Sequence, residues 1–142
     1  MADTKDYGAE PYVFNIEEAT LEIDLFRVCK WTGKNFQVTL MSIEPGDDIG
    51  LEIHEDHDQF LRIEGGIGFV QMGEEPGNFI IEQDVEDGDV VIVPAGSWHN
   101  ITNTGTKALK IYSIYAPVEH AHGTIHETKE DAEEAEAAEH EN

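Results

Sequence analysis

The chain has 142 residues, 39% of them hydrophobic and 8% aromatic, which is enough to bury one domain core and too little for two. Its 8 Lys and Arg residues face 31 Asp and Glu residues, giving a formal net charge of -23. Such a surface repels nucleic-acid phosphates and anionic lipid headgroups, so neither nucleic acid nor a membrane is an expected partner. The one cysteine, Cys29, cannot form an internal disulfide, and the N-terminus lacks the apolar run of a signal peptide, so a cytoplasmic protein is expected.

Residues 1–11 are polar and carry Gly8 and Pro11, which predicts a flexible lead-in. Over residues 12–126, short runs rich in Val, Ile, Leu, Phe and Thr alternate with turn residues, as in the strands of one domain. Residues 19–24 are the one segment there with helical character. Many short strands with frequent turns predict an all-β sandwich or barrel. The predicted strands are 36–43, 49–54, a hairpin over 59–72 around Gly65 and Gly66, 79–85, 90–94, 98–104 and 107–116.

The C-terminal residues 127–142 hold eight carboxylates and one lysine, with alanines between them. This composition is typical of a solvated helix or a frayed end, and it offers no apolar stripe that would dock on the domain. We therefore expect an acidic, mobile tail.

Two histidine-containing segments carry the candidate site. In the first, Glu52 and His54 are two residues apart on a predicted strand, so their side chains project from the same face. Gln59 begins the next strand after a short turn, and antiparallel pairing can bring its amide oxygen beside His54. If that turn is one residue shorter, the carboxylate of Asp58 takes the place of Gln59. His57 is expected at the exposed tip of the turn.

In the second segment, a buried-looking strand ends in a tight Pro-Ala-Gly turn, and His99 opens the following strand. Turn chemistry does not require a histidine at that position. The segment resembles the second sequence motif of the cupin superfamily, which it matches at every fixed position: Gly88, Pro94, Gly96, His99 and Asn103.

The first segment resembles the other cupin motif. Gly46, His54 and Gly66 stand at its fixed positions. Glu52 takes the place of the motif's first histidine, and Gln59 takes the place of its glutamate. As a whole, the chain is similar to small single-domain bacterial cupins, which are loosely grouped with mannose-6-phosphate isomerase-like proteins.

This resemblance implies a cupin double-stranded β-helix, a small jelly-roll-like barrel, over residues 12–126. It also implies one divalent ion, Fe, Mn, Ni or Zn, bound by inward-facing side chains. Carried over by motif position, the ligands are Glu52, His54, Gln59 and His99, with Asp58 as competitor to Gln59. Small cupins tend to form homodimers, and exposed strands within residues 12–35 are the expected contact.

Three further histidines follow the last predicted strand. His120 and His122 in extended chain would form an adventitious metal grip. Alternatively, His120, His122 and His126 lie on a solvated segment that crosses the barrel mouth or a partner subunit. From strand parity, the apolar residues expected to line a pocket for a small ligand are Met41, Phe60, Ile92, Ile101, Tyr112 and Ile114.

Two functions fit this interpretation. The first is an enzyme that uses the metal as a Lewis acid on a small polar metabolite, a sugar, sugar acid or keto acid, in isomerase, lyase or dioxygenase chemistry. In that case Glu52 serves as general base if it does not bind the metal. The alternative is a non-catalytic binding or sensing protein with a structural metal.

Overall fold

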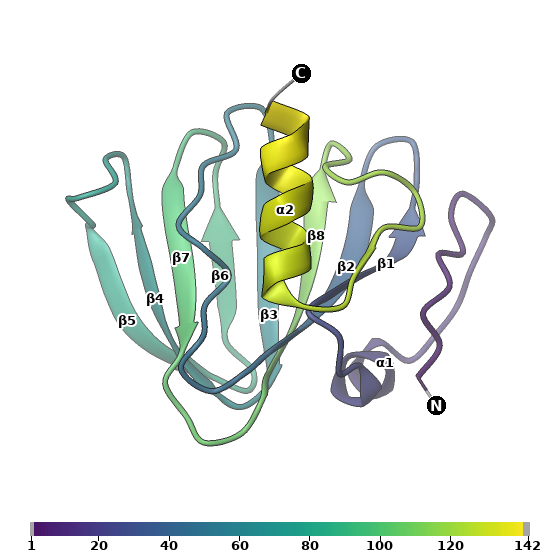
Figure 1. Ribbon diagram of the computed structural model, residues 1–142, viewed down its shortest axis with the longest axis horizontal. Coiled ribbons are helices and arrows are strands. Elements are labelled where there is room, and N and C mark those ends of the chain that lie inside the picture. The colour runs from purple at the N-terminus through teal and green to yellow at the C-terminus, as the bar shows by residue number, and fades with distance from the viewer. Residues whose placement is uncertain (1, 141–142) are drawn as a thin grey trace.

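The computed structural model describes residues 2–140, which form two antiparallel β-sheets and two helices (Figure 1). The larger sheet has the order β6-β3-β8-β2-β1-β9, and the smaller sheet has the order β5-β4-β7. This confirms the predicted all-β architecture. No helix in the described part of the chain is long and apolar enough to cross a membrane. The strands are β1 (Arg27–Thr32), β2 (Gln37–Ile43), β3 (Asp58–Gly65), β4 (Ile67–Gly73), β5 (Ile81–Glu86), β6 (Val90–Val93), β7 (Trp98–Asn103), β8 (Leu109–Ala116) and β9 (Ile125–His126).

The hairpin predicted over residues 59–72 is wrong, because its two strands belong to different sheets. β3 pairs with β6 and β8, whereas β4 pairs with β5 and β7. The chain crosses between the sheets at Gly66, whose φ of 90° lies in the left-handed region. A Cβ there would meet the carbonyl oxygen of Ala108 at 2.8 Å, so glycine is also needed for the close approach to the start of β8.

The strand predicted over residues 49–54 is reduced to one isolated bridge to β7, Glu52 to His99, and a second bridge just before it joins Asp48 to Thr102. Gly50 lies between them with a φ of 91°, which interrupts the extended backbone. The bridge between Glu52 and His99 nevertheless has both of its backbone hydrogen bonds. The Glu52 N–H donates to the His99 carbonyl at 3.1 Å, and the His99 N–H donates to the Glu52 carbonyl at 2.9 Å.

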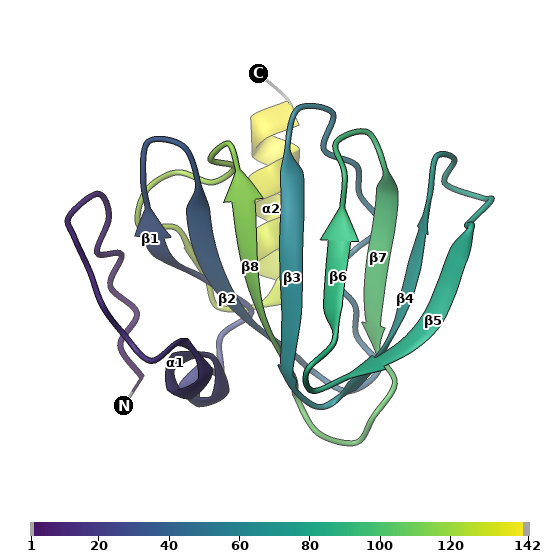
Figure 2. The same cartoon turned by 180° about the vertical axis from the view of Figure 1, so that it is seen from behind.

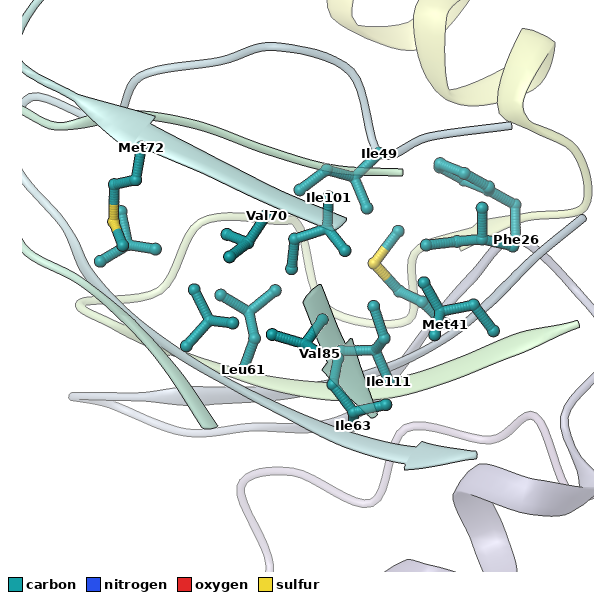
Figure 3. Packing of buried hydrophobic residues seen from close by; sticks show 14 of the residues in the cluster. Phe26, Met41, Ile49, Leu61, Ile63, Val70, Met72, Val85, Ile101 and Ile111 are labelled. Atoms are coloured by element: carbon teal, nitrogen blue, oxygen red, sulfur yellow. The ribbon is translucent and has the colours of Figure 1, made fainter. Parts of the chain in front are cut away.

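The main hydrophobic core fills the space between the two sheets (Figure 3). Alternation along most of β3, β4 and β8 sends every second side chain into this space. β2 is buried on both faces because Met41 faces the core while Leu40, on the other face, packs with Ile23 and Val28. The buried core residues include Met41, Leu61, Ile63, Val70, Met72, Val85, Ile101 and Ile111.

The N-terminal residues cover the outer face of β2. Helix α1 (Ile16–Glu22) begins at Asn15, whose side-chain oxygen accepts a hydrogen bond from the Glu18 N–H at 2.9 Å. Ahead of it, Asp6 is buried and accepts hydrogen bonds from the N–H groups of Thr32 and Gly123. The lead-in is therefore tied both to β1 and to the chain that follows β8. Met1 lies outside the described residues.

Most of the acidic tail forms helix α2 (Lys129–His140), which lies in front of β3 and β8 in Figure 1 and behind them in Figure 2. Thr128 caps the helix, since its hydroxyl accepts from the Asp131 N–H while the Asp131 carboxylate accepts from the Thr128 N–H. Ala132 is only 3% exposed and packs in the main core. The tail thus has a docking contact that its sequence did not indicate. Residues 141 and 142 lie outside the described part.

Position 132 offers a direct test of this contact. We expect Ala132→Asp to lower the free energy of unfolding by about 1–3 kcal/mol, because it places a carboxylate in the apolar core. Ala137→Asp, on the exposed side of the same helix, adds the same charge and changes stability by at most about 0.5 kcal/mol. Urea denaturation followed by circular dichroism measures both, and equal effects of the two variants would show that α2 does not dock.

Candidate metal centre

One group of side chains in the described part of the chain has the composition and spacing of a metal site. Glu52, His54 and His99 each offer one ligand atom, and the three atoms lie within 4.8 Å of one another. The backbone bridge between Glu52 and His99 brings the first segment against β7. His54 follows Glu52 by two residues in extended chain, so its side chain lies beside those of Glu52 and His99. The predicted cluster therefore comes together for these three residues.

Both histidines are oriented so that Nε2 is the nitrogen directed at the group. His99 Nδ1 lies 3.2 Å from the carbonyl oxygen of Ser97, and His54 Nδ1 lies 3.6 Å from a carboxylate oxygen of Glu119. Each Nε2 then faces the same Glu52 oxygen, Oε1, at 3.4 Å for His54 and 3.6 Å for His99. A carbonyl or carboxylate behind the far nitrogen is the usual support of a metal-bound imidazole.

The two Nε2 atoms are buried and have no hydrogen-bond partner. Buried polar atoms without partners are rare in native proteins, so each requires an explanation. A divalent cation bound by two imidazole nitrogens and a carboxylate oxygen satisfies both at once. The residues present therefore fit a metal ion.

The electrostatics of the group agree with this fit. Burial alone would raise the pKa of the Glu52 carboxyl, but the His54 and His99 imidazoles beside it outweigh burial and hold that pKa well below its usual range. Burial lowers the pKa of His54, yet the carboxylates of Glu52 and Glu119 reverse the shift, so its pKa is raised. The site is an anionic environment that attracts positive charge, as a proton or as a metal ion.

Gln59 is buried on β3, and its orientation leaves an oxygen free. Its Nε2 donates to the hydroxyl of Ser113 at 2.9 Å, and its Oε1 has no partner. Gln59 is opposite Tyr115 in the β3–β8 ladder, and the Tyr115 ring lies 5.7 Å from the His54 ring. Gln59 therefore lies next to a residue that contacts His54, and its oxygen is unused.

Asp58, the competitor of Gln59, does not enter the site. It is exposed, and its carboxylate accepts a hydrogen bond from the Ala95 N–H at 2.9 Å, which fastens the turn before β7. His57 is also displaced from its expected place. Its Nε2 contacts the Val118 carbonyl at 3.1 Å and a Glu119 carboxylate oxygen at 3.2 Å, so it is packed against the chain after β8 and not at a free tip.

A cavity of about 430 Å³ opens beside Glu52 and His54. Half of its lining comes from the segment after β8 and from α2. The sequence leaves open whether the histidines of that segment form an adventitious metal grip or cross the barrel mouth or a partner subunit, and it predicts the residues of α2 to lie outside the site. His120 and His126 both line the cavity, whereas His122 is exposed and its Nε2 contacts the Gly8 carbonyl oxygen. The lining residues from this part of the chain are Glu119, His120, Thr124, His126, Ala135 and Glu136.

The apolar pocket residues expected from strand parity are wrong. Met41 and Ile101 are in the closed core. Phe60 and Tyr112 stack on each other on the outer face of the large sheet, with ring centroids 6.3 Å apart. Ile92 and Ile114 flank Phe60 in the ladders on that same outer face. On β3 the inward residue is Gln59, the expected ligand position, and not Phe60; on β8 the parity is opposite to the one assumed, so Ser113 and Tyr115 are the inward residues.

Comparison with known proteins places the site in a family. Uncharacterized protein YrkC of Bacillus subtilis (strain 168) is 56% identical over 132 residues, which are 93% of this chain and 71% of that protein. The crystal structure of BH2720 from Bacillus halodurans has a TM-score of 0.91 at 53% identity and covers 92% of this chain and 98% of that one. A predicted oxalate decarboxylase of Thermotoga maritima has a TM-score of 0.52 at 25% identity, over 59% of this chain and 68% of that one.

Residues 39–115 match the family model of the cupin domain. That range contains Glu52, His54, Gln59 and His99, and the two antiparallel sheets agree with the double-stranded β-helix expected from the motifs. The chain belongs to the cupin family.

Proposed function

We propose that this cupin binds one divalent transition metal ion at Glu52, His54 and His99 and uses it on a small polar ligand in the adjoining cavity. One observation carries the proposal. Two buried imidazole nitrogens converge on a carboxylate oxygen without any hydrogen-bond partner, at the edge of a cavity of about 430 Å³. A site of three protein ligands beside a cavity keeps coordination positions for water or a ligand, as catalytic sites do.

Glu52 is better suited to ligation than to general-base catalysis. Its lowered pKa means that the carboxylate is ionised and weakly basic near neutral pH, whereas an efficient base has a pKa near the working pH. His54 and His99 hold their Nε2 lone pairs toward the same point because their Nδ1 atoms face Glu119 and Ser97. When bound, the ion would supply Lewis-acid polarisation of a carbonyl or hydroxyl oxygen.

The ligand class we propose is a sugar, sugar acid or keto acid, and the reaction class is isomerase, lyase or dioxygenase. The cavity size suits a small molecule, and its lining is rich in histidine and carboxylate side chains that bind oxygen-bearing groups. The likeness to a predicted oxalate decarboxylase supports chemistry on a small organic acid.

A non-catalytic binding or sensing cupin is the alternative. The observation in its favour is the free Oε1 of Gln59, because a fourth protein donor would complete a tetrahedral shell and close the site. Metal-bound water distinguishes the two, since it is retained in the open site and absent from the closed one.

The metal is tested by element analysis of the purified protein. We expect close to one transition metal ion per chain, and we expect the double variant His54→Ala, His99→Ala to lose it because two of three ligands are gone. His122→Ala removes an exposed histidine outside the group and should leave the metal content unchanged. Circular dichroism checks that the barrel persists. Full metal content in the double variant would refute this site.

The fourth donor is tested at position 59. If the Gln59 oxygen reaches the ion, Gln59→Glu should tighten metal binding and Gln59→Leu should weaken it, each on the order of tenfold. Gln83→Glu makes the same change at an exposed site on β5 and should have no effect. Competition with a fluorescent chelator measures the three affinities. Unchanged affinity in Gln59→Leu would confine the ligand set to the triad.

We also propose a homodimer in the cytoplasm, where the buried free thiol of Cys29 stays reduced. Within residues 12–35, where we expect the contact, β1 is paired with β2 along its length and with β9 at Arg27 and Val28. The edge strand β6 offers an alternative, since Ile92 is 58% exposed on it.

Ile92→Glu should shift the mass measured by light scattering from that of a dimer to that of a monomer, whereas Val13→Glu should not. A monomeric wild-type protein would contradict the proposal.

A further inference from the structure

The cavity has two walls of different origin. The first wall carries the metal ligands and lies within the matched cupin range, residues 39–115. The second wall is built by the chain outside that range, chiefly by His120 and by His126 on β9. The inference below concerns this second wall, and it rests on the proposed function in so far as the ligand also reaches the metal position.

Arg27, directly behind the second wall, is a buried cation without an anion. It is 2% exposed on β1 and is paired with His126 across the β1–β9 ladder. Its Nη1 lies 3.1 Å from His126 Nδ1, and its Nε has no partner. None of the ion pairs among the described residues includes it. A buried guanidinium without a carboxylate is unfavourable and indicates that an anion is bound nearby in the working protein.

The contact with Arg27 fixes the chemistry of His126. A guanidinium only donates hydrogen bonds, so His126 Nδ1 must accept, and the ring must carry its single proton on Nε2. Burial and the neighbouring Arg27 charge both lower the pKa of His126, in agreement with a neutral ring. His126, which lines the cavity, therefore carries an N–H donor at Nε2, because Arg27 occupies its Nδ1.

His120 is held beside His126 before any ligand binds. The amide of Gln37 grips its backbone from both sides, accepting from the His120 N–H and donating to the His120 carbonyl, each at 2.8 Å. The His120 ring packs between Tyr115, at 5.3 Å, and His126, at 6.1 Å. Its Nε2 is buried without a partner. Burial, assisted by Arg27, lowers the pKa of His120 to about 3, so this ring is neutral too.

We propose that Arg27, His120 and His126 form a subsite that binds the carboxylate of a small monocarboxylic acid. A second oxygen-bearing group of the same acid, such as a hydroxyl, reaches the metal position at Glu52, His54 and His99. A carboxylate accepts from the fixed His126 N–H and from a proton on His120 Nε2, and it neutralises the field of Arg27. The same cavity is lined by the carboxylates of Glu52, Glu119 and Glu136, which disfavours a second negative charge on the ligand.

The test compares lactate with lactamide, which have the same shape and the same hydroxyl but differ in charge. Isothermal titration calorimetry on the full chain, metal-free and loaded with Zn²⁺, should show lactate binding at least tenfold tighter than lactamide. Arg27→Met should abolish this preference. Lys34→Met removes one positive charge from an exposed turn and should retain it. His126→Phe keeps the ring but removes its nitrogens, and it should also lose the preference.

The outcomes separate this inference from the metal proposal. A lactate preference that depends on Arg27 and His126 in the metal-free protein supports the subsite even if no metal binds. A protein that loads metal but binds lactate and lactamide equally, or binds neither, overturns the subsite and leaves the metal site standing. An equal loss of the lactate preference in Arg27→Met and in Lys34→Met would also overturn the subsite. The melting temperature of metal-free Arg27→Met should change little, because the removal of a buried charge without an anion offsets the loss of the contacts with His126 and with the Phe26 ring. A fall of several degrees would mean that the arginine is structural.

Discussion

The pair of hydrogen bonds between the backbones of Glu52 and His99 is the constraint on which the site depends. These bonds fasten an irregular segment to the edge of the small sheet, although Gly50 prevents that segment from being a regular strand. Because directly opposite residues of an antiparallel pair project their side chains from the same face, the Glu52 carboxylate and the His99 imidazole meet without any long-range adjustment. His54 follows from the two-residue repeat of the extended chain. The metal ligands are therefore positioned by backbone geometry.

The two ends of the barrel differ in their inward-facing residues, which are apolar at one end and polar at the other. Apolar residues such as Leu61, Ile63 and Ile111 fill one region between the sheets. Along the same inward faces, β3 and β8 change to Gln59, Ser113 and Tyr115, of which Tyr115 lines the cavity. The polar groups at this end are buried but only partly paired, which favours binding over stability. A closed core and an incompletely satisfied polar end in one small domain are the structural basis of the proposed function.

Much of the fold and the triad could be predicted from the sequence because both depend on local patterns. Alternation located most strands, and motif spacing located Glu52, His54 and His99. The errors have physical causes that are not local. The hairpin around Gly66 failed because a glycine turn does not reveal whether the next strand pairs or crosses to another sheet. The pocket residues failed because parity fixes which side chains share a face but not which face is inside. The second wall depends on the contact of Arg27 with His126, 99 residues later, for which no spacing rule exists.

The hydrogen bond from the Gly123 N–H to Asp6 has a consequence for how this chain can change during evolution. It joins the N-terminal flank to the C-terminal flank, and β1 and β9 join them again a short distance away. Neither flank belongs to the matched cupin range, yet each one supports the other. A lineage that shortened the first flank would loosen the second and with it half of the cavity lining. The two flanks are therefore expected to be gained or lost together.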